Sequence, residues 1–446
     1  MRILMLSQFY PPTIGGEEQH VRRLSHALAR RGHDVAVATL WHEGLADFEL
    51  DREVRIYRIP GTIQRAGWIF SEDARRHAPP FPDPETIWAL RNIIVQEQPE
   101  VVHAHNWLVH SFLPLKSWSK AKLVVTLHDY SLLCAKKRLM YRNQSCSGAD
   151  FSKCLTCSAK HYGKIKGTTT MFGNWMMSRV EQKLVDMFLP VSQAVAQGNQ
   201  LAEKRVPYQV VPNFLPDIHD VEQQNADEYL AQLPDGKFLL YVGDLSKDKG
   251  IHILLRAYAG LPDAPPLVLI GRICGDTPTE IPPNVLVLNS WPHYAVTQAW
   301  ERSLAVIVPS VWPEPFGMVV IEAMAAGRPV IASRSGGLTD IVVESETGLL
   351  VPPGDVEALR AAIQALLDDP ALCLAMGQAG RQRVKIYQAN VVTPAIEYIY
   401  AQLLQLNTCA PGKQSRPYQE LRSTAELGFR QRLSSAISPY LRKPFV

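Results

Sequence analysis

Residues 309–330 read PSVWPEPFGMVVIEAMAAGRPV, the most specific pattern in this chain. Apolar ends around a proline-rich centre predict a strand, a loop, a helix and a second strand. The two prolines beside Glu314 keep it out of regular helix, because proline fixes φ and lacks an N–H group. Gly317 is expected to precede a helix that contains Glu322. Two carboxylates eight residues apart can therefore reach one ligand, one from a loop and one from a helix.

The chemistry of this segment suits a ligand that carries hydroxyl pairs and phosphate. A carboxylate can accept both protons of a cis-diol, so the two acids can hold a sugar and a ribose. Backbone N–H groups at the start of the helix would face a phosphate. These donors belong to Phe316, Gly317, Met318 and Val319. A capped surface helix with incidental acids is the alternative that stays open.

Around this segment, short apolar runs alternate with helical stretches, which is typical of a parallel sheet covered by helices. Strands are predicted at Phe238–Val242, Leu267–Ile270, Val285–Leu288, Leu304–Val308 and Val330–Ala332. Asp355 follows two prolines and a glycine, and we expect it to cap a helix over Asp355–Leu367. The second half of the chain is therefore predicted to form one doubly wound domain.

The first half of the chain shows the same alternation. Strands are predicted at Ile3–Ser7, Val35–Leu40, Val54–Ile59, Val101–Ala104 and Leu123–Leu127, and last strand ends at Leu189–Ser192 and Val210–Asn213. A helix over Glu17–Arg31 has its apolar positions on one face and stops at Gly32. We therefore expect an α/β protein with two Rossmann-like, doubly wound parallel-sheet domains facing a central cleft, where the carboxyl ends of strands bind ligands.

Changes in composition give the expected domain boundaries. The first domain is predicted at residues 1–216 with a cysteine-rich basic insert at about 130–177, a polar linker at 217–236, and the second domain at 237–388. A helix at 389–406 is expected to cross back to the first domain, and a basic tail fills 407–446. In that tail, seven Lys and Arg residues stand against two acids, and we expect it to be partly disordered or to form an added amphipathic helix.

Overall composition narrows the class of protein. The chain has 446 residues, 46% of them apolar, and a formal net charge of +3. So small a charge does not point to nucleic acid. No apolar run reaches the roughly 18 residues of a spanning helix, so we expect a cytoplasmic protein. Seven cysteines, an odd number in a chain without an export signal, favour reduced thiols or a metal site over disulfides.

The 309–330 segment resembles the Glu-x7-Glu signature of glycosyltransferase family 4, and the resemblance runs over most of residues 1–405. Further landmarks match in order and spacing: Gly15-Gly16 after the first strand, His128 at a strand end, Val211-Pro212-Asn213 before the linker, and Gly336-Gly337. Each alone is weak, since a glycine pair is also an ordinary turn and a lone histidine is often structural. The family implies the GT-B fold and retaining transfer of a sugar from a nucleotide-diphosphate donor, often in surface-polysaccharide or glycolipid synthesis.

The resemblance also implies residue roles. Glu322 is expected to bind the ribose diol, Glu314 the sugar hydroxyls, and His128 to position the sugar. Lys249 is expected to hold the diphosphate, and Gly15, Gly16 and Asn213 belong to the donor site. Same-face attack assisted by the leaving phosphate requires no catalytic metal and no protein nucleophile.

One position departs from the family pattern. The family usually has Gly-Arg-Leu-x-x-x-Lys-Gly after the first strand of the second domain, whereas this chain has Gly-Asp-Leu-Ser-Lys-Asp-Lys-Gly at 243–250. Lys249 is retained, but Asp244 stands where the arginine is expected. Lys247 or Arg272 could supply the missing positive charge.

The basic insert contains Cys134, Cys146, Cys154 and Cys157 in a Cys-x11-Cys-x7-Cys-x2-Cys arrangement. Four thiolates suit tetrahedral zinc, and the closing Cys-x2-Cys has structural-site spacing. Unligated or redox cysteines and an iron–sulfur cluster are the alternatives.

Charge in the same insert suggests its ligand. Between residues 134 and 166, eight Lys and Arg residues stand against one acid. This charge favours recognition of a lipid-linked or phosphorylated acceptor at an anionic membrane surface. A solvated basic loop is the alternative.

Three other function classes would each show a different sequence signature. A nicotinamide oxidoreductase would need Gly-x-Gly-x-x-Gly after a first strand, and neither half of the chain has it. A non-catalytic nucleotide-sugar-binding or scaffold protein of the same fold remains the alternative, because Asp244 removes one expected cation. A phosphorylase would need a pyridoxal-phosphate lysine site that the sequence does not show.

Overall fold

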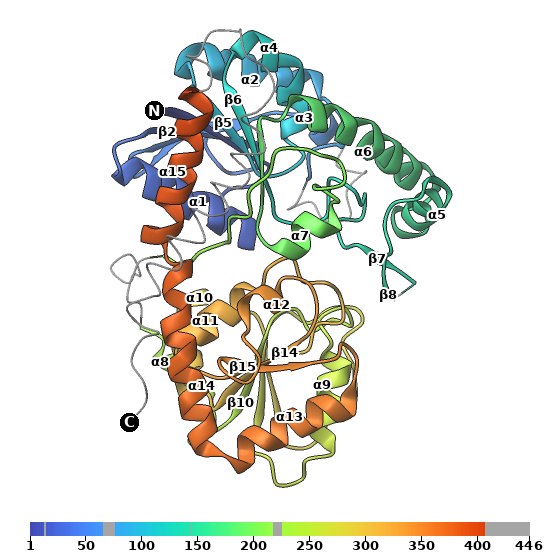
Figure 1. Ribbon diagram of the computed structural model, residues 1–446, viewed down its shortest axis with the longest axis vertical. Helices are drawn as coiled ribbons and strands as arrows, with labels where there is room; N and C mark the ends of the chain where they lie inside the picture. The colour runs from blue at the N-terminus through green and yellow to red at the C-terminus, as the bar shows by residue number, and fades with distance from the viewer. Residues whose placement is uncertain (13–14, 66–75, 143, 217–224, 406–446) are drawn as a thin grey trace. The chain divides into compact units, whose positions relative to one another are not determined.

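The computed structural model describes residues 1–12, 15–65, 76–142, 144–216 and 225–405 (Figure 1). The chain divides into two compact units, Met1–Ile396 and Glu397–Val446. Both large sheets lie in the first unit. The tail predicted at 407–446 lies outside the described residues, and so does 217–224 of the predicted linker.

The first sheet has seven strands in the order β3-β4-β2-β1-β5-β6-β9. Their bounds are β1 Arg2–Ser7, β2 Asp34–Leu40, β3 Phe48–Asp51, β4 Val54–Ile59, β5 Val101–Ala104, β6 Lys122–Leu127 and β9 Met187–Pro190. All neighbours are parallel except β3 and β4. The central strand β1 is buried on both faces, as its unbroken apolar run predicts for a covered parallel sheet.

Seven α-helices and two 3-10 turns accompany this sheet among the described residues. They are α1 Gly16–Arg30, α2 Pro84–Glu97, α3 Val109–Phe112, α4 Lys116–Ser119, α5 Phe151–Tyr162, α6 Lys164–Leu184 and α7 Gln193–Gly198, with 3-10 turns at Ile63–Arg65 and Leu113–Leu115. On α1, Val21, Leu24 and Leu28 are fully buried, which confirms the apolar face predicted from their spacing. The basic insert contributes α5, α6 and a small hairpin of β7 Met140–Tyr141 and β8 Gln144–Ser145.

The second sheet has six parallel strands in the order β12-β11-β10-β13-β14-β15. Their bounds are β10 Leu239–Val242, β11 Leu267–Ile270, β12 Val285–Leu288, β13 Ala305–Val308, β14 Val330–Ser333 and β15 Gly348–Val351. The helices of this half are α8 Asp227–Leu230, α9 Ile251–Ala259, α10 His293–Arg302, α11 Met318–Ala325, α12 Leu338–Ile341, α13 Val356–Asp368 and α14 Pro370–Arg383, then a 3-10 turn at Val384–Tyr387 and α15 Ala389–Gln405. The Asp355 side chain accepts from the Ala358 N–H at 2.9 Å, which confirms the predicted cap of α13.

Two parts of the strand prediction differ from the structure. Val210–Asn213 forms no strand: Tyr208 makes one isolated bridge to Phe188, and Pro212 then removes a backbone donor. The short strands β3 and β15 were not predicted, because β3 alternates exposed and half-buried residues and β15 begins with glycine.

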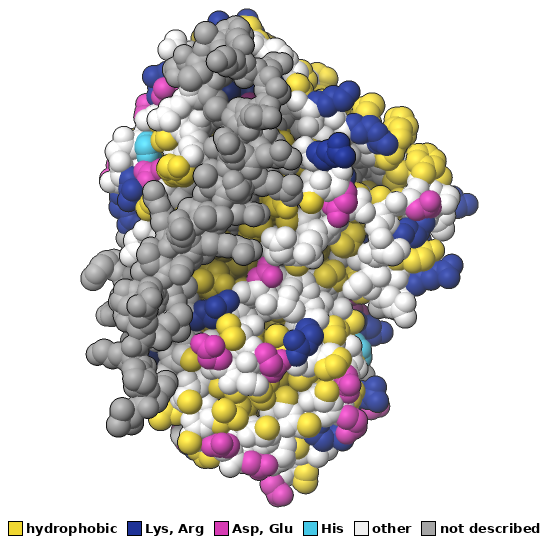
Figure 2. All heavy atoms as spheres, in the orientation of Figure 1, with side chains coloured by type: hydrophobic (Ala, Val, Ile, Leu, Met, Phe, Trp, Pro, Cys, Tyr) yellow, Lys and Arg dark blue, Asp and Glu magenta, His cyan; other side chains and the backbone are white. Residues whose placement is uncertain are grey.

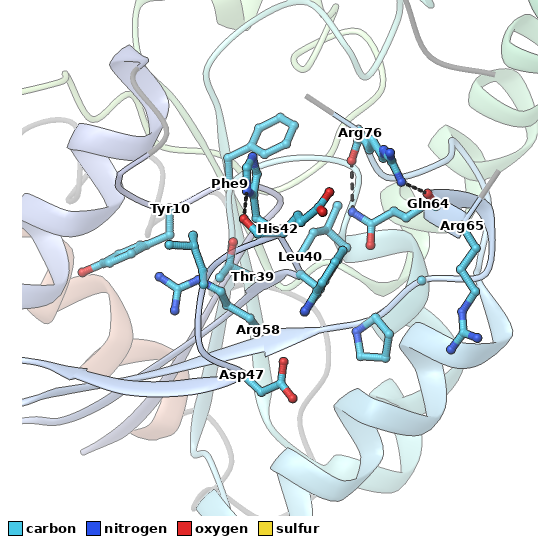
Figure 3. A pocket seen from close by; sticks show the side chains of 15 residues that line it. Phe9, Tyr10, Thr39, Leu40, His42, Asp47, Arg58, Gln64, Arg65 and Arg76 are labelled. Atoms are coloured by element: carbon cyan, nitrogen blue, oxygen red, sulfur yellow. Dashed lines mark hydrogen bonds between the residues drawn. The ribbon is translucent and has the colours of Figure 1, made fainter. Parts of the chain in front are cut away.

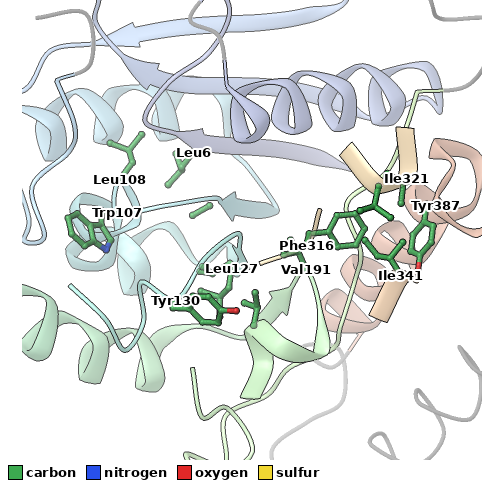
Figure 4. Close-up of a cluster of buried hydrophobic side chains, with 14 of the residues drawn as sticks. Leu6, Trp107, Leu108, Leu127, Tyr130, Val191, Phe316, Ile321, Ile341 and Tyr387 are labelled. Atoms are coloured by element: carbon green, nitrogen blue, oxygen red, sulfur yellow. The ribbon is translucent and has the colours of Figure 1, made fainter. Parts of the chain in front are cut away.

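One hydrophobic cluster includes buried side chains from both halves (Figure 4). Leu6 and Leu127 come from the first sheet, and Phe316 and Ile321 from the loop and helix after β13. Backbone pairing also links the halves, since Leu215 N–H donates to Tyr387 O at 2.8 Å and Ala389 N–H donates to Leu215 O at 3.0 Å. The segments on either side of the second sheet are therefore tied together at this point.

Candidate functional site

Glu314 and Lys249 meet at the carboxyl edge of the second sheet. Lys249 lies between β10 and α9, and Glu314 lies between β13 and α11, so two neighbouring strands deliver them to one edge. Lys249 Nζ donates to Glu314 Oε1 at 2.6 Å, and Ser310 Oγ donates to the same oxygen at 2.6 Å. Because Glu314 is only 7% exposed, this carboxylate is buried, paired and fixed in orientation.

The loop after β14 holds the backbone of Glu314. Gly337 N–H donates to Glu314 O at 2.6 Å. Gly336 has a φ of +58°, and a Cβ at this position would lie 2.2 Å from Glu314 O. The predicted Gly336-Gly337 landmark thus permits a close backbone approach that a side chain would prevent.

Glu322 lies on α11, as predicted, with Gly317 preceding the helix at a φ of +118°. Its Oε1 is 2.9 Å from His293 Nε2. Burial lowers the pKa of Arg23, and the negative charge of Glu322 opposes that shift, so the α1 guanidinium lies close enough to sense this acid. The first-turn N–H groups of Met318 and Val319 have no intrahelical acceptor, as in any helix start, which leaves them suited to an anion.

His128 belongs to a cluster of histidines at the carboxyl edge of the first sheet. Ligand atoms of His20, His105 and His128 all lie within 4.8 Å of one another. His105 Nδ1 is 3.1 Å from His128 Nε2, and His103 Nε2 is 2.7 Å from Thr126 Oγ1. Burial lowers the pKa of His103 and of His128 to about 3, so both are neutral near pH 7.

The sequence prediction named His128 and missed the three other histidines. The available signal was His-x-His at 103–105, because one of these side chains follows the end of β5, the strand beside β6. Neighbouring parallel strands end at the same edge, which brings the side chains together.

Gly15, Gly16 and Asn213 are the remaining residues that the sequence predicts for the donor site. Gly15 precedes α1, and a Cβ there would lie 2.1 Å from Glu18 Oε2, whereas a Cβ at Gly16 would meet nothing within 4 Å. The Oδ1 atom of Asn213 is buried and has no hydrogen-bond partner among the described residues. Ser192 Oγ donates to Pro315 O at 2.5 Å, so the end of β9 contacts the Glu314 loop.

Asp244 and Arg272 form a bidentate pair beside Lys249. Arg272 Nη2 donates to Asp244 Oδ2 at 3.0 Å, and Nε donates to Oδ1 at 3.2 Å. Both side chains are substantially exposed: that of Arg272 is 61% exposed and that of Asp244 is 43% exposed. A guanidinium therefore lies next to the position where the family pattern has arginine, supplied by the loop after β11. The Lys247 N–H donates to Asp276 Oδ2 at 3.0 Å.

The four insert cysteines gather around the hairpin and α5. Cys146 N–H donates to Leu139 O at 2.8 Å, and Cys157 Sγ is 3.9 Å from Met140 O. Burial raises the pKa of the Cys134 and Cys154 thiols, and the charge of Cys154 adds to the first shift. Among the described residues the thiols are free, and they do not form a group of metal ligands as close as the three histidines.

A cavity of about 730 Å³ opens at the ends of β1, β2 and β4 (Figure 3). Aromatic and basic side chains line it, among them Phe9, Tyr10, Trp41, Arg58 and Arg76. Sequence reasoning did not identify this cavity, although its residues directly follow strand ends. Its hydrogen-bonding groups and aromatic faces are of the kind that bind small polar molecules.

Two family models match this chain, one over each half. Residues 14–216 match the model of Glycosyltransferase Family 4, and residues 223–383 match Glycosyl transferases group 1. A glycogen synthase of Mycobacterium tuberculosis is 28% identical over 421 residues, covering 86% of this chain and 90% of that protein.

Two solved structures share the fold. Sucrose-phosphate synthase from Thermosynechococcus elongatus superposes with a TM-score of 0.70 at 23% identity, covering 91% of this chain and 99% of that one. HepE from Anabaena in complex with UDP superposes with a TM-score of 0.66 at 17% identity, covering 90% and 100%. The fold and the family models define a glycosyltransferase of the GT-B class. The chain belongs to glycosyltransferase family 4.

Proposed function

We propose that this protein transfers a sugar from a nucleotide-diphosphate donor to a glycan or lipid-linked acceptor with retention of anomeric configuration, in surface-polysaccharide or glycolipid synthesis. The observation that carries the proposal is the buried Glu314 carboxylate, held by Lys249 at 2.6 Å at the carboxyl edge of the second sheet. A carboxylate fixed there can accept hydrogen bonds from sugar hydroxyls, while the ammonium group beside it can form an ion pair with a phosphate.

The donor site in this proposal extends from Lys249 along the start of α11. Glu322 binds the ribose diol, and the backbone N–H groups at residues 316–319 face the diphosphate. His293, 2.9 Å from Glu322, would share this acid with the ribose. The UDP complex of HepE supports a nucleotide diphosphate as the ligand class.

Arg272 is proposed to supply the positive charge that Asp244 removes. Its two hydrogen bonds to Asp244 hold the guanidinium beside the position of the missing arginine. Because the group is 61% exposed, it remains accessible to a diphosphate. Lys247 is a weaker candidate, since the contact seen for it is a backbone bond to Asp276.

The transfer step requires that charge be stabilised on the leaving group. The bond between the anomeric carbon and the diphosphate oxygen breaks, and an acceptor hydroxyl oxygen forms the new bond on the same face. The acceptor proton passes to the leaving phosphate. Lys249 and the α11 start stabilise the developing negative charge, and the neutral imidazole of His128 positions the sugar by hydrogen bonding. No catalytic metal is needed for this step.

The acceptor is proposed to bind on the first sheet, where the cavity lined by Trp41 and Arg76 opens (Figure 3). An aromatic side chain can cover the apolar face of a sugar ring, and arginine can bind its hydroxyl or phosphate groups. The protein is further proposed to be cytoplasmic and to contact the inner face of the membrane. Among the described helices, none is long and apolar enough to cross a bilayer.

Structural zinc on the four insert cysteines remains a proposal. Its support is the placement of all four on the hairpin, its flanks and α5. Metal analysis of the purified protein tests it: about one zinc per chain, lost when Cys154 and Cys157 are both changed to Ser, is the expected result. A metal-free, stably folded protein would favour free thiols instead.

A non-catalytic nucleotide-sugar-binding protein is the second candidate, and Asp244 is the observation that favours it. Thermal-shift screening against UDP, GDP, ADP and their sugar conjugates, together with donor hydrolysis, separates the two. The enzyme should be stabilised by one donor and release its sugar slowly, and Lys249→Ala should lose both properties while the exposed Lys237→Ala keeps them. Stabilisation without hydrolysis or transfer would favour the binding protein.

A further inference from the structure

Helix α6 turns its largest apolar side chains outward. Ile165, Phe172, Trp175 and Met176 are 87%, 51%, 40% and 42% exposed. Spacings of three, four and seven residues place them on one face of the helix. An apolar stripe on a helix usually faces the core, so this arrangement needs a separate explanation.

The opposite face of α6 is buried against the rest of the protein. Met171 and Met177 are each 4% exposed. A Cβ at Gly173 would lie 2.8 Å from Pro80 O, and one at Gly167 would lie 2.3 Å from Ser158 O. Glu181 on this face pairs with the buried His110 at 2.7 Å. The helix therefore cannot rotate to bury its aromatic face without losing these contacts.

The exposed aromatic side chains form an ordered group. Phe172 stacks on Trp175 with ring centroids 5.8 Å apart, and Phe151 from α5 meets Trp175 edge-on at 6.1 Å. The Arg179 guanidinium lies 3.7 Å above the Trp175 ring. These contacts fix the rings at the surface, which lowers the entropic cost of binding through them.

Basic residues surround this group. Helices α5 and α6 carry Lys153, Lys160, Lys164, Lys166, Arg179 and Lys183. Their one acidic residue is Glu181, which is buried against His110. Figure 2 shows hydrophobic and basic side chains side by side over α5 and α6, at the right of the view. The surface is thus apolar at its centre and positively charged around it.

We propose that this α5–α6 face, defined by Phe151, Ile165, Phe172, Trp175 and Met176, docks on a bilayer that contains anionic phospholipid. Tryptophan and phenylalanine enter the headgroup region of a bilayer, while lysine stems extend to lipid phosphates. The excess of cations selects anionic over zwitterionic lipid. The inference rests on the proposed function, because it names the surface that would bring the enzyme to a lipid-linked acceptor.

The test is co-flotation of the full chain with vesicles of phosphatidylcholine, with or without about one third phosphatidylglycerol. Binding is expected to the anionic vesicles, and the triple variant Ile165→Ser, Phe172→Ser, Trp175→Ser should lower the partition coefficient at least about tenfold. Trp88→Ser, which removes a 66% exposed tryptophan from α2, is the matched control and should change binding less than about twofold. Lys160→Gln with Lys164→Gln should weaken anionic binding by about fivefold per charge.

Thermal shift with nucleotide and the oligomeric state are measured on the same variants. Nucleotide-induced thermal shift on the same variants reports folding and the donor site, so loss of vesicle binding with donor binding intact is the expected pattern. Absence of vesicle binding by the wild-type chain would overturn the docking surface and the proposed membrane contact, and would leave the proposed sugar transfer standing. A concentration-dependent dimer that the triple variant dissociates would also overturn it, since a second copy of the chain would then cover this face.

Discussion

Replacement of Gly336 by alanine should disable the donor site while leaving the fold intact. The new Cβ would lie 2.2 Å from Glu314 O, whereas van der Waals contact needs at least about 3.4 Å, so one backbone must move by roughly 1 Å. A displacement of about 1 Å in a positioned group costs on the order of a hundredfold in rate. The φ of +58° adds about 1 to 2 kcal/mol of strain for any residue with a side chain.

Gly354→Ala is the matched control for this experiment. Gly354 also has a positive φ, +82°, but a Cβ there meets nothing within 4 Å. Gly354→Ala should therefore lose about 1 to 2 kcal/mol of unfolding free energy in urea titrations, and Gly336→Ala should lose more, because its Cβ also meets the Glu314 backbone. Donor hydrolysis should fall about a hundredfold for Gly336→Ala and less than about twofold for Gly354→Ala. Equal rates in the two variants would refute the view that Gly336 positions Glu314.

Three more outcomes follow from the site. Lys249→Met should reduce transfer by about 10²- to 10³-fold, through loss of charge on the leaving diphosphate, measured as steady-state turnover against Lys237→Met. Arg272→Ala should weaken donor binding about tenfold in calorimetry, and Asp244→Asn, which releases the guanidinium, should not; equal loss in both would assign the pair a structural role. Since burial lowers the pKa of His103 to about 3, below the unfolded value of about 6.5, its contribution to stability is present above pH 6.5 and lost as the pH falls towards 3. Between pH 7.5 and 5.0 the wild type should therefore lose about 2 kcal/mol more than His103→Gln in urea unfolding, and parallel losses would contradict the lowered pKa.

Much of the fold follows from local patterns in the sequence. The strands Val54–Ile59, Val101–Ala104, Leu267–Ile270 and Val285–Leu288 have the predicted bounds, because each is a short run rich in aliphatic residues and bounded by turn residues. The edge strand β3 could not be found in this way, since its pairing to β4 leaves half of its side chains in solvent. The strand end predicted at Val210–Asn213 is wrong, because these residues are partly buried beside β9 without forming a regular ladder of hydrogen bonds.

The candidate site was predicted as separate landmarks, and the structure adds the contacts between them. Sequence spacing placed Glu314 in a loop and Glu322 on a helix, but it could not show that Lys249, 65 residues earlier, pairs with the first of them. That pairing depends on β10 and β13 being neighbours in the sheet although β11 and β12 lie between them in sequence. The histidine cluster was missed for a different reason: β5 and β6 are consecutive strands, and His-x-His at 103–105 was not read together with His128, which β5 and β6 bring next to His105.

The geometry of the Asp244–Arg272 pair supports the proposal that Arg272 supplies the positive charge missing at position 244. Read alone, Asp244 replaces a cation by an anion at the diphosphate position. The sheet order places β11 beside β10, so the loop after β11 reaches the same edge, and the second residue of that loop is an arginine with two hydrogen bonds to the aspartate. The pair as a whole is neutral, yet its guanidinium is the more exposed partner at 61% against 43%, so an approaching diphosphate meets the cation first. If the charge has moved to the neighbouring strand, the reciprocal double variant Asp244→Arg, Arg272→Asp should retain donor binding, whereas Arg272→Asp alone should abolish it.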